Sequence, residues 1–143
     1  MTIASILRNK GAEVVTVRPT QMLGEVASIL VRHRIGAVLV QEGDDAPVGI
    51  LSERDIVRVF AEEDGLTDGV TAADAMTRIL HTVTLDTPIT RALEMMTDRR
   101  VRHLPVLEDG RIRGIVSIGD LVKARIDAAV SEADALRDYV STS

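Results

Sequence analysis

The chain has 143 residues, 45% hydrophobic and 27% charged, as expected of one compact domain or two half-size units sharing a core. A net charge of −5 and only two aromatic residues argue against nucleic-acid binding, which needs a basic face and rings that stack on bases. The absence of cysteine excludes disulfides, thiol chemistry and cysteine-ligated zinc. No apolar run approaches the ~20 residues that span a bilayer, and the N-terminus lacks an export core, so we expect a cytoplasmic protein with no membrane partner.

The first half of the chain predicts five short elements. A β-rich run at 14–17 is followed by apolar residues at helical spacing from 23 to 30. Next come a buried strand at 37–40, a polar turn, and a strand at 48–51 that leads into a helix. The predicted order is β-α-β-β-α.

The second half predicts the same order after a polar stretch. A β-rich run at 82–85 precedes helical spacing over 89–96, and Pro88 stands where the first turn of a helix tolerates proline. Strands at 103–107 and 112–116 follow, and a helix ends the copy. Two such units predict an α+β fold.

The two halves also align residue by residue. Thr16–Val40 lies on Thr82–Val106 at an offset of 66, and Val48–Arg58 lies on Arg113–Lys123 at an offset of 65. In both copies a glycine is followed three residues later by a serine and then by an aspartate three residues further on: Gly49, Ser52, Asp55 and Gly114, Ser117, Asp120. Such a match indicates an internal duplication.

The last helix continues beyond the repeat with a narrow apolar seam. Its members alternate in steps of four and three, which predicts a helical partner. That partner is either the N-terminal segment with Ile3, Ile6 and Leu7 or a second subunit. The seam consists of Val122, Ile126, Ala129, Ala133, Leu136 and Val140.

Each Ser-x-x-Asp pair stands between a predicted strand and helix, a position with two interpretations. A serine and an acidic residue three positions later can cap a helix. Alternatively, the helix N-terminus attracts a phosphate, the hydroxyl adds a donor and the aspartate accepts hydrogen bonds from two ribose hydroxyls. The preceding glycine would allow close backbone approach. Because capping alone does not require the glycine and the strand to recur, we favour a nucleotide site at Ser52/Asp55 and at Ser117/Asp120.

The duplicated unit resembles a pair of CBS domains, the regulatory repeats named after cystathionine β-synthase. The segments Ser52–Asp55, Arg102–Val106 and Ser117–Asp120 are similar in particular to small stand-alone bacterial CBS-pair proteins. The resemblance implies clefts between the repeats that bind AMP, ADP, ATP, NAD(H) or S-adenosylmethionine. In these clefts Ser or Thr serves the phosphate and Asp the ribose. It also implies a homodimer.

We therefore expect four segments along the chain. The N-terminal segment and the first CBS repeat occupy residues 1–62, and a linker occupies 63–75. The second repeat covers 76–127, and a C-terminal helical extension covers 128–143.

The copies differ at positions that bear charge. Arg54 aligns with Gly119, whereas Arg102 and His103 align with Gly36 and Ala37. Since arginine can grip a phosphate with two hydrogen bonds, we expect both clefts to hold an anion, from different positions and with unequal affinity.

Further candidates come from the strands. The resemblance implies that Thr16 and Thr82, which open equivalent strands, help to hold the base. Pro105, aligned with Leu39, lacks an amide hydrogen and is expected to end a strand ladder near the pocket. The full set of candidate ligand-binding residues is Thr16, Ala37, Ser52, Arg54, Asp55, Thr82, Arg102, His103, Pro105, Ser117 and Asp120.

The sequence does not predict catalysis. The three histidines form no close pair, so no metal site is expected, and the Gly-x-Ser-x-Gly elbow, the glycine-lysine phosphate loop and the Gly-x-Gly-x-x-Gly fingerprint are missing. We expect a sensor without a catalytic cofactor, whose bound adenine nucleotide shifts the orientation of the repeats and so acts on a separate, unidentified partner protein. A nucleotide-processing enzyme with weak hydrolase activity and a structural dimeric adaptor with vestigial pockets are the alternatives.

Overall fold

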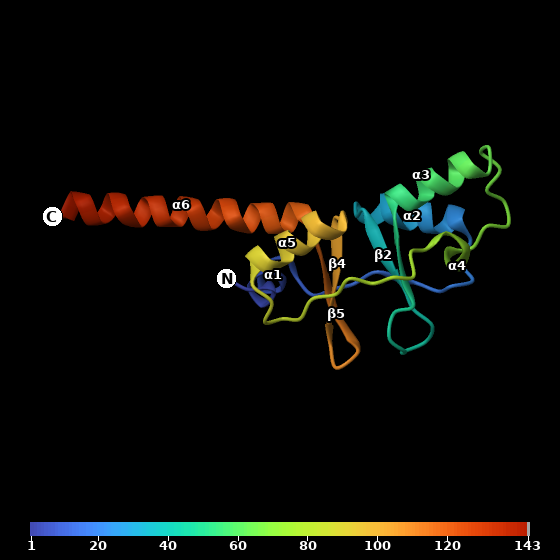
Figure 1. Cartoon of the computed structure of the whole chain (residues 1–143), viewed down its shortest axis with the longest axis horizontal. Coiled ribbons are helices and arrows are strands. Elements are labelled where there is room, and N and C mark those ends of the chain that lie inside the picture. The colour runs from blue at the N-terminus through green and yellow to red at the C-terminus, as the bar shows by residue number, and fades with distance from the viewer. Residues whose placement is uncertain (143) are drawn as a thin grey trace.

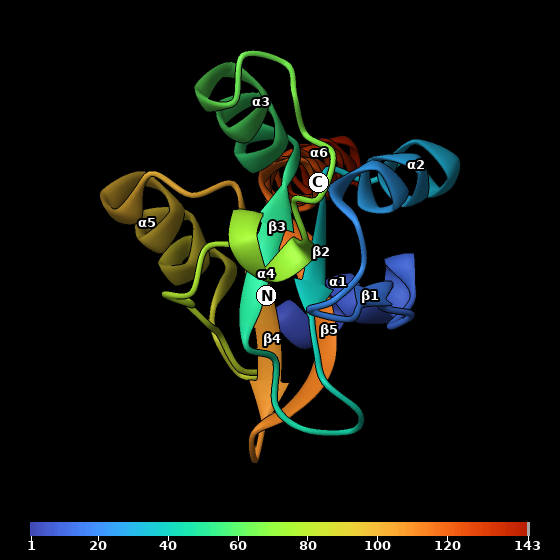
Figure 2. The same ribbon diagram turned by 90° about the vertical axis from the view of Figure 1, so that its right-hand side faces the viewer.

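The computed structural model describes residues 1–142 as two β/α units and a long C-terminal helix that extends away from them (Figure 1). Viewed along that helix, the strands lie in the middle and α2, α3 and α5 lie around them (Figure 2). The predicted α+β duplication is confirmed. The elements are α1 (Ile3–Lys10), β1 (Thr16–Val17), α2 (Leu23–His33), β2 (Ala37–Val40), β3 (Gly49–Ser52), α3 (Glu53–Glu62), α4 (Ala72–Ala75), α5 (Ile89–Arg99), β4 (His103–Glu108), β5 (Arg111–Ser117) and α6 (Ile118–Thr142).

Each unit is built on an antiparallel pair of strands. β2 pairs with β3, with Ala37 opposite Ser52 and Val40 opposite Gly49, and β4 pairs with β5. In the first unit β1 adds a parallel edge strand to β2. All four residues of β2 are buried, as the uninterrupted apolar run predicted.

The strand expected at 82–85 is reduced to one bridge, and Pro105 explains the difference. Val83 bridges to Val106 in parallel, and its N–H donates to the Pro105 carbonyl (N···O 3.0 Å). The preceding bridge of a parallel ladder would need an amide N–H at position 105, which proline lacks. The same position in the first unit is Leu39, and there the two-residue strand β1 forms.

Each core is completed by the helix that precedes the other repeat. Helix α4 places Ala72 and Ala75, both fully buried, in the core of the first unit. Helix α1 places Ile3 and Leu7 in the core of the second unit. The structural boundaries therefore differ from the expected ones. The polar linker ends before α4 rather than at residue 75, and the N-terminal segment packs with the second repeat rather than the first, because burial of apolar surface decides the neighbour.

The glycine of the duplicated motif makes room for this exchange. A Cβ at Gly49 would lie 2.5 Å from Met76 Sδ and 3.0 Å from the Thr77 carbonyl oxygen. A Cβ at Gly114 would lie 2.8 Å from Leu7 Cδ2. Met76 directly follows α4, and Leu7 belongs to α1, so each glycine admits the segment that completes a core. The recurrence of the glycine thus has a packing explanation.

Helix α6 leaves the second unit after its first turns (Figure 1). Leu121 is buried in the second core, whereas Val122, Ile126 and Leu136 of the predicted seam are exposed. Helix α1 contacts α6 but does not cover this seam. The N-terminal segment is therefore not the partner of the seam, and a second subunit stays a prediction. Among residues 1–142, no helix combines the length and the apolar character needed to cross a membrane.

The packing at Gly49 predicts an unequal response to two glycine-to-alanine changes. We expect Gly49→Ala to lower the free energy of unfolding by roughly 1–3 kcal/mol, because the new methyl group overlaps Met76 and backbone. Gly24→Ala, in α2 with open space around the added Cβ, should leave stability unchanged or raise it by up to about 1 kcal/mol. Urea unfolding of both variants measures this. Equal destabilisation would contradict the packing role.

Candidate functional site

The first serine-aspartate pair forms a complete capping box. Ser52 ends β3 and is the N-cap of α3, and its Oγ accepts from the Asp55 N–H (3.3 Å) while its own N–H donates to Asp55 Oδ2 (3.0 Å). The Ser52 hydroxyl also donates to the same oxygen (3.2 Å). Capping is therefore a real function of this motif, and nucleotide binding has to be judged from what surrounds it.

The other carboxylate oxygen of Asp55 contacts the segment after α4. Asp55 Oδ1 accepts from Thr77 Oγ1 (3.1 Å) and from Arg58 Nη2 (3.3 Å), and Arg58 also donates to the Ala75 carbonyl (3.1 Å). Thr77 is held in turn by two backbone hydrogen bonds with Ile50 of β3 (2.8 and 2.9 Å). Because a carboxylate offers about four acceptor positions, Asp55, only 8% exposed, can take a further donor only by exchanging one of these partners.

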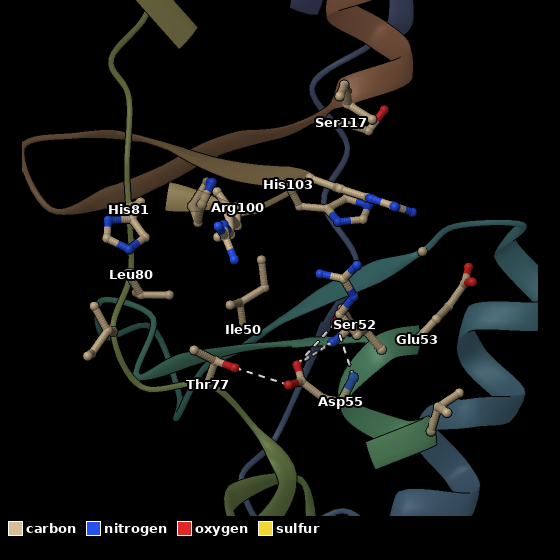
Figure 3. Close-up of a pocket in the computed structure, with 18 residues that line it drawn as sticks. Ile50, Ser52, Glu53, Asp55, Thr77, Leu80, His81, Arg100, His103 and Ser117 are labelled. Atoms are coloured by element: carbon tan, nitrogen blue, oxygen red, sulfur yellow. Dashed lines mark hydrogen bonds between the residues drawn. The ribbon is translucent and has the colours of Figure 1, made fainter. Parts of the chain in front are cut away.

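A cleft of about 630 Å³ lies between the two units beside this junction (Figure 3). One side is formed by the start of α3 and by Thr77, Ile79, Leu80 and His81 of the segment that connects the units. The opposite side is formed by residues 100–103, Pro105, Ser117 and Ile118 of the second unit, and Gly36 and Ile50 also contribute to the lining. Figure 3 shows His103 and Arg100 across the cleft from Ser52, Asp55 and Thr77. The cleft thus joins basic groups, a hydroxyl pair and apolar side chains in one space.

Arg100 owes its place in this lining to the end of α5. It follows the last helical residue with a left-handed backbone (φ 54°), and Arg34 ends α2 in the same conformation (φ 54°). This conformation closes a helix with backbone hydrogen bonds and turns the chain into the next strand. Arg100 lines the cleft, whereas its repeat-related partner does not.

His103 stands where the two units meet. A Cβ at Gly36 would lie 3.1 Å from His103 Nε2 and 3.2 Å from Glu53 Oε1, so both side chains lie against the Gly36 backbone. Burial lowers the pKa of His103 below its usual range. The Glu53 and Asp120 carboxylates oppose this effect, and nearby cations reinforce it. At neutral pH the imidazole is therefore uncharged and can both donate and accept a hydrogen bond.

Most of the residues proposed from the sequence meet in this cleft, and four do not. Thr16 and Thr82 are exposed and lie outside the lining. Ala37 is buried within β2, and Asp120 belongs to the second junction. The residues that the structure brings together are Ser52, Arg54, Asp55, Arg102, His103, Pro105 and Ser117.

Sequence reasoning missed the segment that connects the two units. Thr77, Ile79, Leu80 and His81 line the cleft, as does Glu53. The positions related to residues 77, 79, 80 and 81 fall before residue 16, where the alignment of the two copies begins, so the duplication gave no signal for these four residues.

The second serine-aspartate pair has a different third partner. The Ser117 N–H donates to Asp120 Oδ2 (2.8 Å) and the Asp120 N–H to Ser117 Oγ (3.2 Å), which repeats the cap. Lys10 Nζ, at the end of α1, also donates to Asp120 Oδ2 (2.7 Å) and to the Ile115 carbonyl (3.0 Å). Burial alone would raise the pKa of Asp120, but the hydrogen bonds from Lys10 and Ser117 outweigh it and the pKa is lowered. Asp120 is therefore ionised and already paired.

The CBS domain family matches this chain twice, over residues 5–62 and 72–127. The chain belongs to the CBS-domain family. The first match includes most of α1 and ends at residue 62, and the second begins at α4. The cleft described above therefore lies between the two CBS repeats of a pair.

Three similar proteins place the chain within the family. The CBS-domain-containing protein ATU1752 of Agrobacterium tumefaciens has a TM-score of 0.84 and 40% identity, over 87% of this chain and 99% of that one. The mitochondrial CBS domain-containing protein CBSX3 of Arabidopsis thaliana is 32% identical over 97% of this chain and 71% of its own length. The CBS domain pair of protein MJ0100, solved with 5′-methylthioadenosine and S-adenosyl-L-methionine, has a TM-score of 0.78 and 25% identity, over 87% of this chain and 98% of that one.

The surroundings of His103 predict opposite pKa shifts in two variants. Glu53→Gln removes a carboxylate that favours the imidazolium, so the His103 pKa should fall further. Arg102→Met removes a cation that disfavours it, so the pKa should rise. Titration of the imidazole Cε1–H signal by NMR measures both. Shifts of the same sign would show that His103 does not face these groups.

Proposed function

We propose that this CBS pair binds an adenine nucleotide in the cleft between its repeats and acts as a regulatory module. One observation carries the proposal. The cleft joins arginines and a histidine from both repeats with the Ser52–Asp55–Thr77 cluster, in about 630 Å³. This volume falls within the roughly 300–1,000 Å³ typical of small-molecule sites.

Phosphate binding is assigned to the basic side chains. Arg54 lies in the first turn of α3, and Arg100 and Arg102 approach from the second repeat. Guanidinium groups bind phosphate oxygens through paired, charge-assisted hydrogen bonds. The carboxylate of Glu53 lines the same space, so we assign the phosphates to the arginines of both repeats rather than to the helix N-terminus alone.

Adenosine binding is assigned to the other side of the cleft. Since the acceptor positions of Asp55 are filled, a ribose hydroxyl would either displace the Thr77 hydroxyl or donate to it, with Asp55 orienting Thr77 from behind. The apolar side chains of Ile79 and Leu80 supply a surface for the base. The complex of the MJ0100 pair with two adenosine compounds supports adenosine as the common element.

Regulation would follow from the position of the ligand between the repeats. A ligand that contacts both repeats shifts their relative orientation only if its affinity differs between two arrangements. We propose that this shift is read by a separate partner protein, and that the module is a cytoplasmic homodimer. The exposed seam of α6 supports the homodimer. The absence of cysteine supports a cytoplasmic location.

The proposal predicts that AMP stabilises the protein through Arg102. At a hundredfold excess over its dissociation constant, AMP should raise the free energy of unfolding by about 2.7 kcal/mol. Arg102→Met should weaken binding by roughly 10- to 100-fold, because a hydrogen bond to a charged group contributes about 1.5–3 kcal/mol. Thermal unfolding and isothermal calorimetry measure the two effects.

Arg32→Met is the matched control, since Arg32 is exposed on α2 outside the cleft. It should bind AMP like the wild type. If AMP, ATP, NADH and S-adenosylmethionine all leave the melting temperature unchanged, the protein is an adaptor with a vestigial pocket. Conversion of ATP or NADH to products would instead favour the enzyme alternative.

A further inference from the structure

We infer that each chain has one open adenosine site, at the Ser52–Asp55 junction. At the Ser117–Asp120 junction, Lys10 occupies the place that Thr77 holds at the first junction. The inference rests on the proposed function and deepens it. It concerns Asp120 and Lys10, which lie outside the cleft described above.

The two junctions can be compared atom by atom. At the first, Thr77 donates two hydrogen bonds: its N–H to the Ile50 carbonyl (2.8 Å) and its hydroxyl to Asp55 (3.1 Å). Ile115 and Asp120 are the repeat-related positions of Ile50 and Asp55. At the second junction Lys10 Nζ alone makes both contacts, to the Ile115 carbonyl (3.0 Å) and to Asp120 (2.7 Å). One ammonium group thus replaces a backbone amide and a hydroxyl.

The replacement changes what the second junction can bind. Thr77 presents a hydroxyl that can both donate and accept, whereas an ammonium group only donates. The ribose hydroxyls of a nucleoside would have to expel Lys10 from Asp120 and break an ion pair, whereas at Asp55 they compete with a neutral hydroxyl.

The cation at the second junction also comes from a different element. Asp55 is paired with Arg58 of its own helix α3, and this arginine is anchored to the Ala75 carbonyl. The position related to Arg58 is Lys123, whose side chain is exposed and makes no ion pair among those of residues 1–142. Lys10 therefore both fills the second junction and provides the positive charge that pairs with Asp120.

The backbone beside Lys10 is also less fixed than its counterpart. Thr77 forms an antiparallel bridge with Ile50 that fastens the connecting segment to β3. Within residues 1–142, no backbone bridge fastens the exposed residues 11–13 to β5. The second junction thus depends on one lysine side chain where the first has a backbone bridge.

Binding stoichiometry tests the inference. Equilibrium dialysis with AMP should give one site per chain for the wild type and two for Lys10→Met, which keeps the length of the side chain and removes the ammonium group. Arg8→Met is the matched control, because it removes a cation from the same exposed end of α1 and should keep one site. Two sites in the wild type, or one in Lys10→Met, would overturn the inference while the proposed function stands. No AMP binding by any of the three proteins would overturn both.

A second measurement needs no ligand. The chain has two lysines, Lys10 and Lys123, so Lys123 is an internal reference. With limiting acetic anhydride, Lys10 should be acetylated several-fold more slowly than Lys123, and Asp120→Asn should bring the two rates together. Equal rates in the wild type would show that Lys10 does not hold the junction.

Discussion

The exchange of leading helices between the two repeats is the constraint on which the rest of the structure depends. Helix α4 buries its alanines in the first core, and α1 buries Ile3 and Leu7 in the second. The chain at the C-terminal end of each helix is therefore carried to a fixed place beside the strand-helix junction of the repeat that the helix completes. Thr77 reaches Asp55 and Lys10 reaches Asp120 because α4 and α1 are held by apolar burial, the dominant favourable contribution to folding. The chemistry of each junction is thus a consequence of core packing.

This dependence changes how the serine-aspartate motif is understood. In both copies the pair caps a helix, and the glycine before it admits a neighbouring segment. The features common to the two copies are therefore explained by the fold. Features that differ between the copies, such as Arg54 against Gly119 and His103 against Ala37, are the ones that can make the two junctions differ in what they bind. A motif search that weighs only what recurs would look for specificity in the wrong residues.

The sequence predicted the fold where the signal was local and failed where it was tertiary. Apolar periodicity gave both α/β units and the α+β class, because periodicity reports which face of an element is buried. The strand expected at 82–85 is reduced to one bridge because Pro105 lacks the amide N–H that a longer ladder needs. Pro105 was singled out from the sequence, but its effect on the neighbouring strand was not predicted. The helix exchange could not be predicted, since nothing local distinguishes which core receives Ala72. The cleft residues at 77–81 and the Lys10 contact were missed for the same reason.

The asymmetry of the two junctions suggests how a ligand in the open cleft would reach the outside of the protein. Ser117 and Ile118 line this cleft, and Ile118 is also the first residue of α6. The capping box between Ser117 and Asp120 fixes the start of that helix, and Lys10 fixes Asp120 to α1. A ligand that moves Ser117 would therefore act on β5, α6 and α1 together. The longest of these elements, α6, carries exposed apolar side chains at Ile126 and Leu136. Because a helix is rigid along its axis, a small rotation at Ile118 becomes a larger displacement at its far end. The surface that such a rotation would displace most is the part of α6 that lies farthest from the cleft.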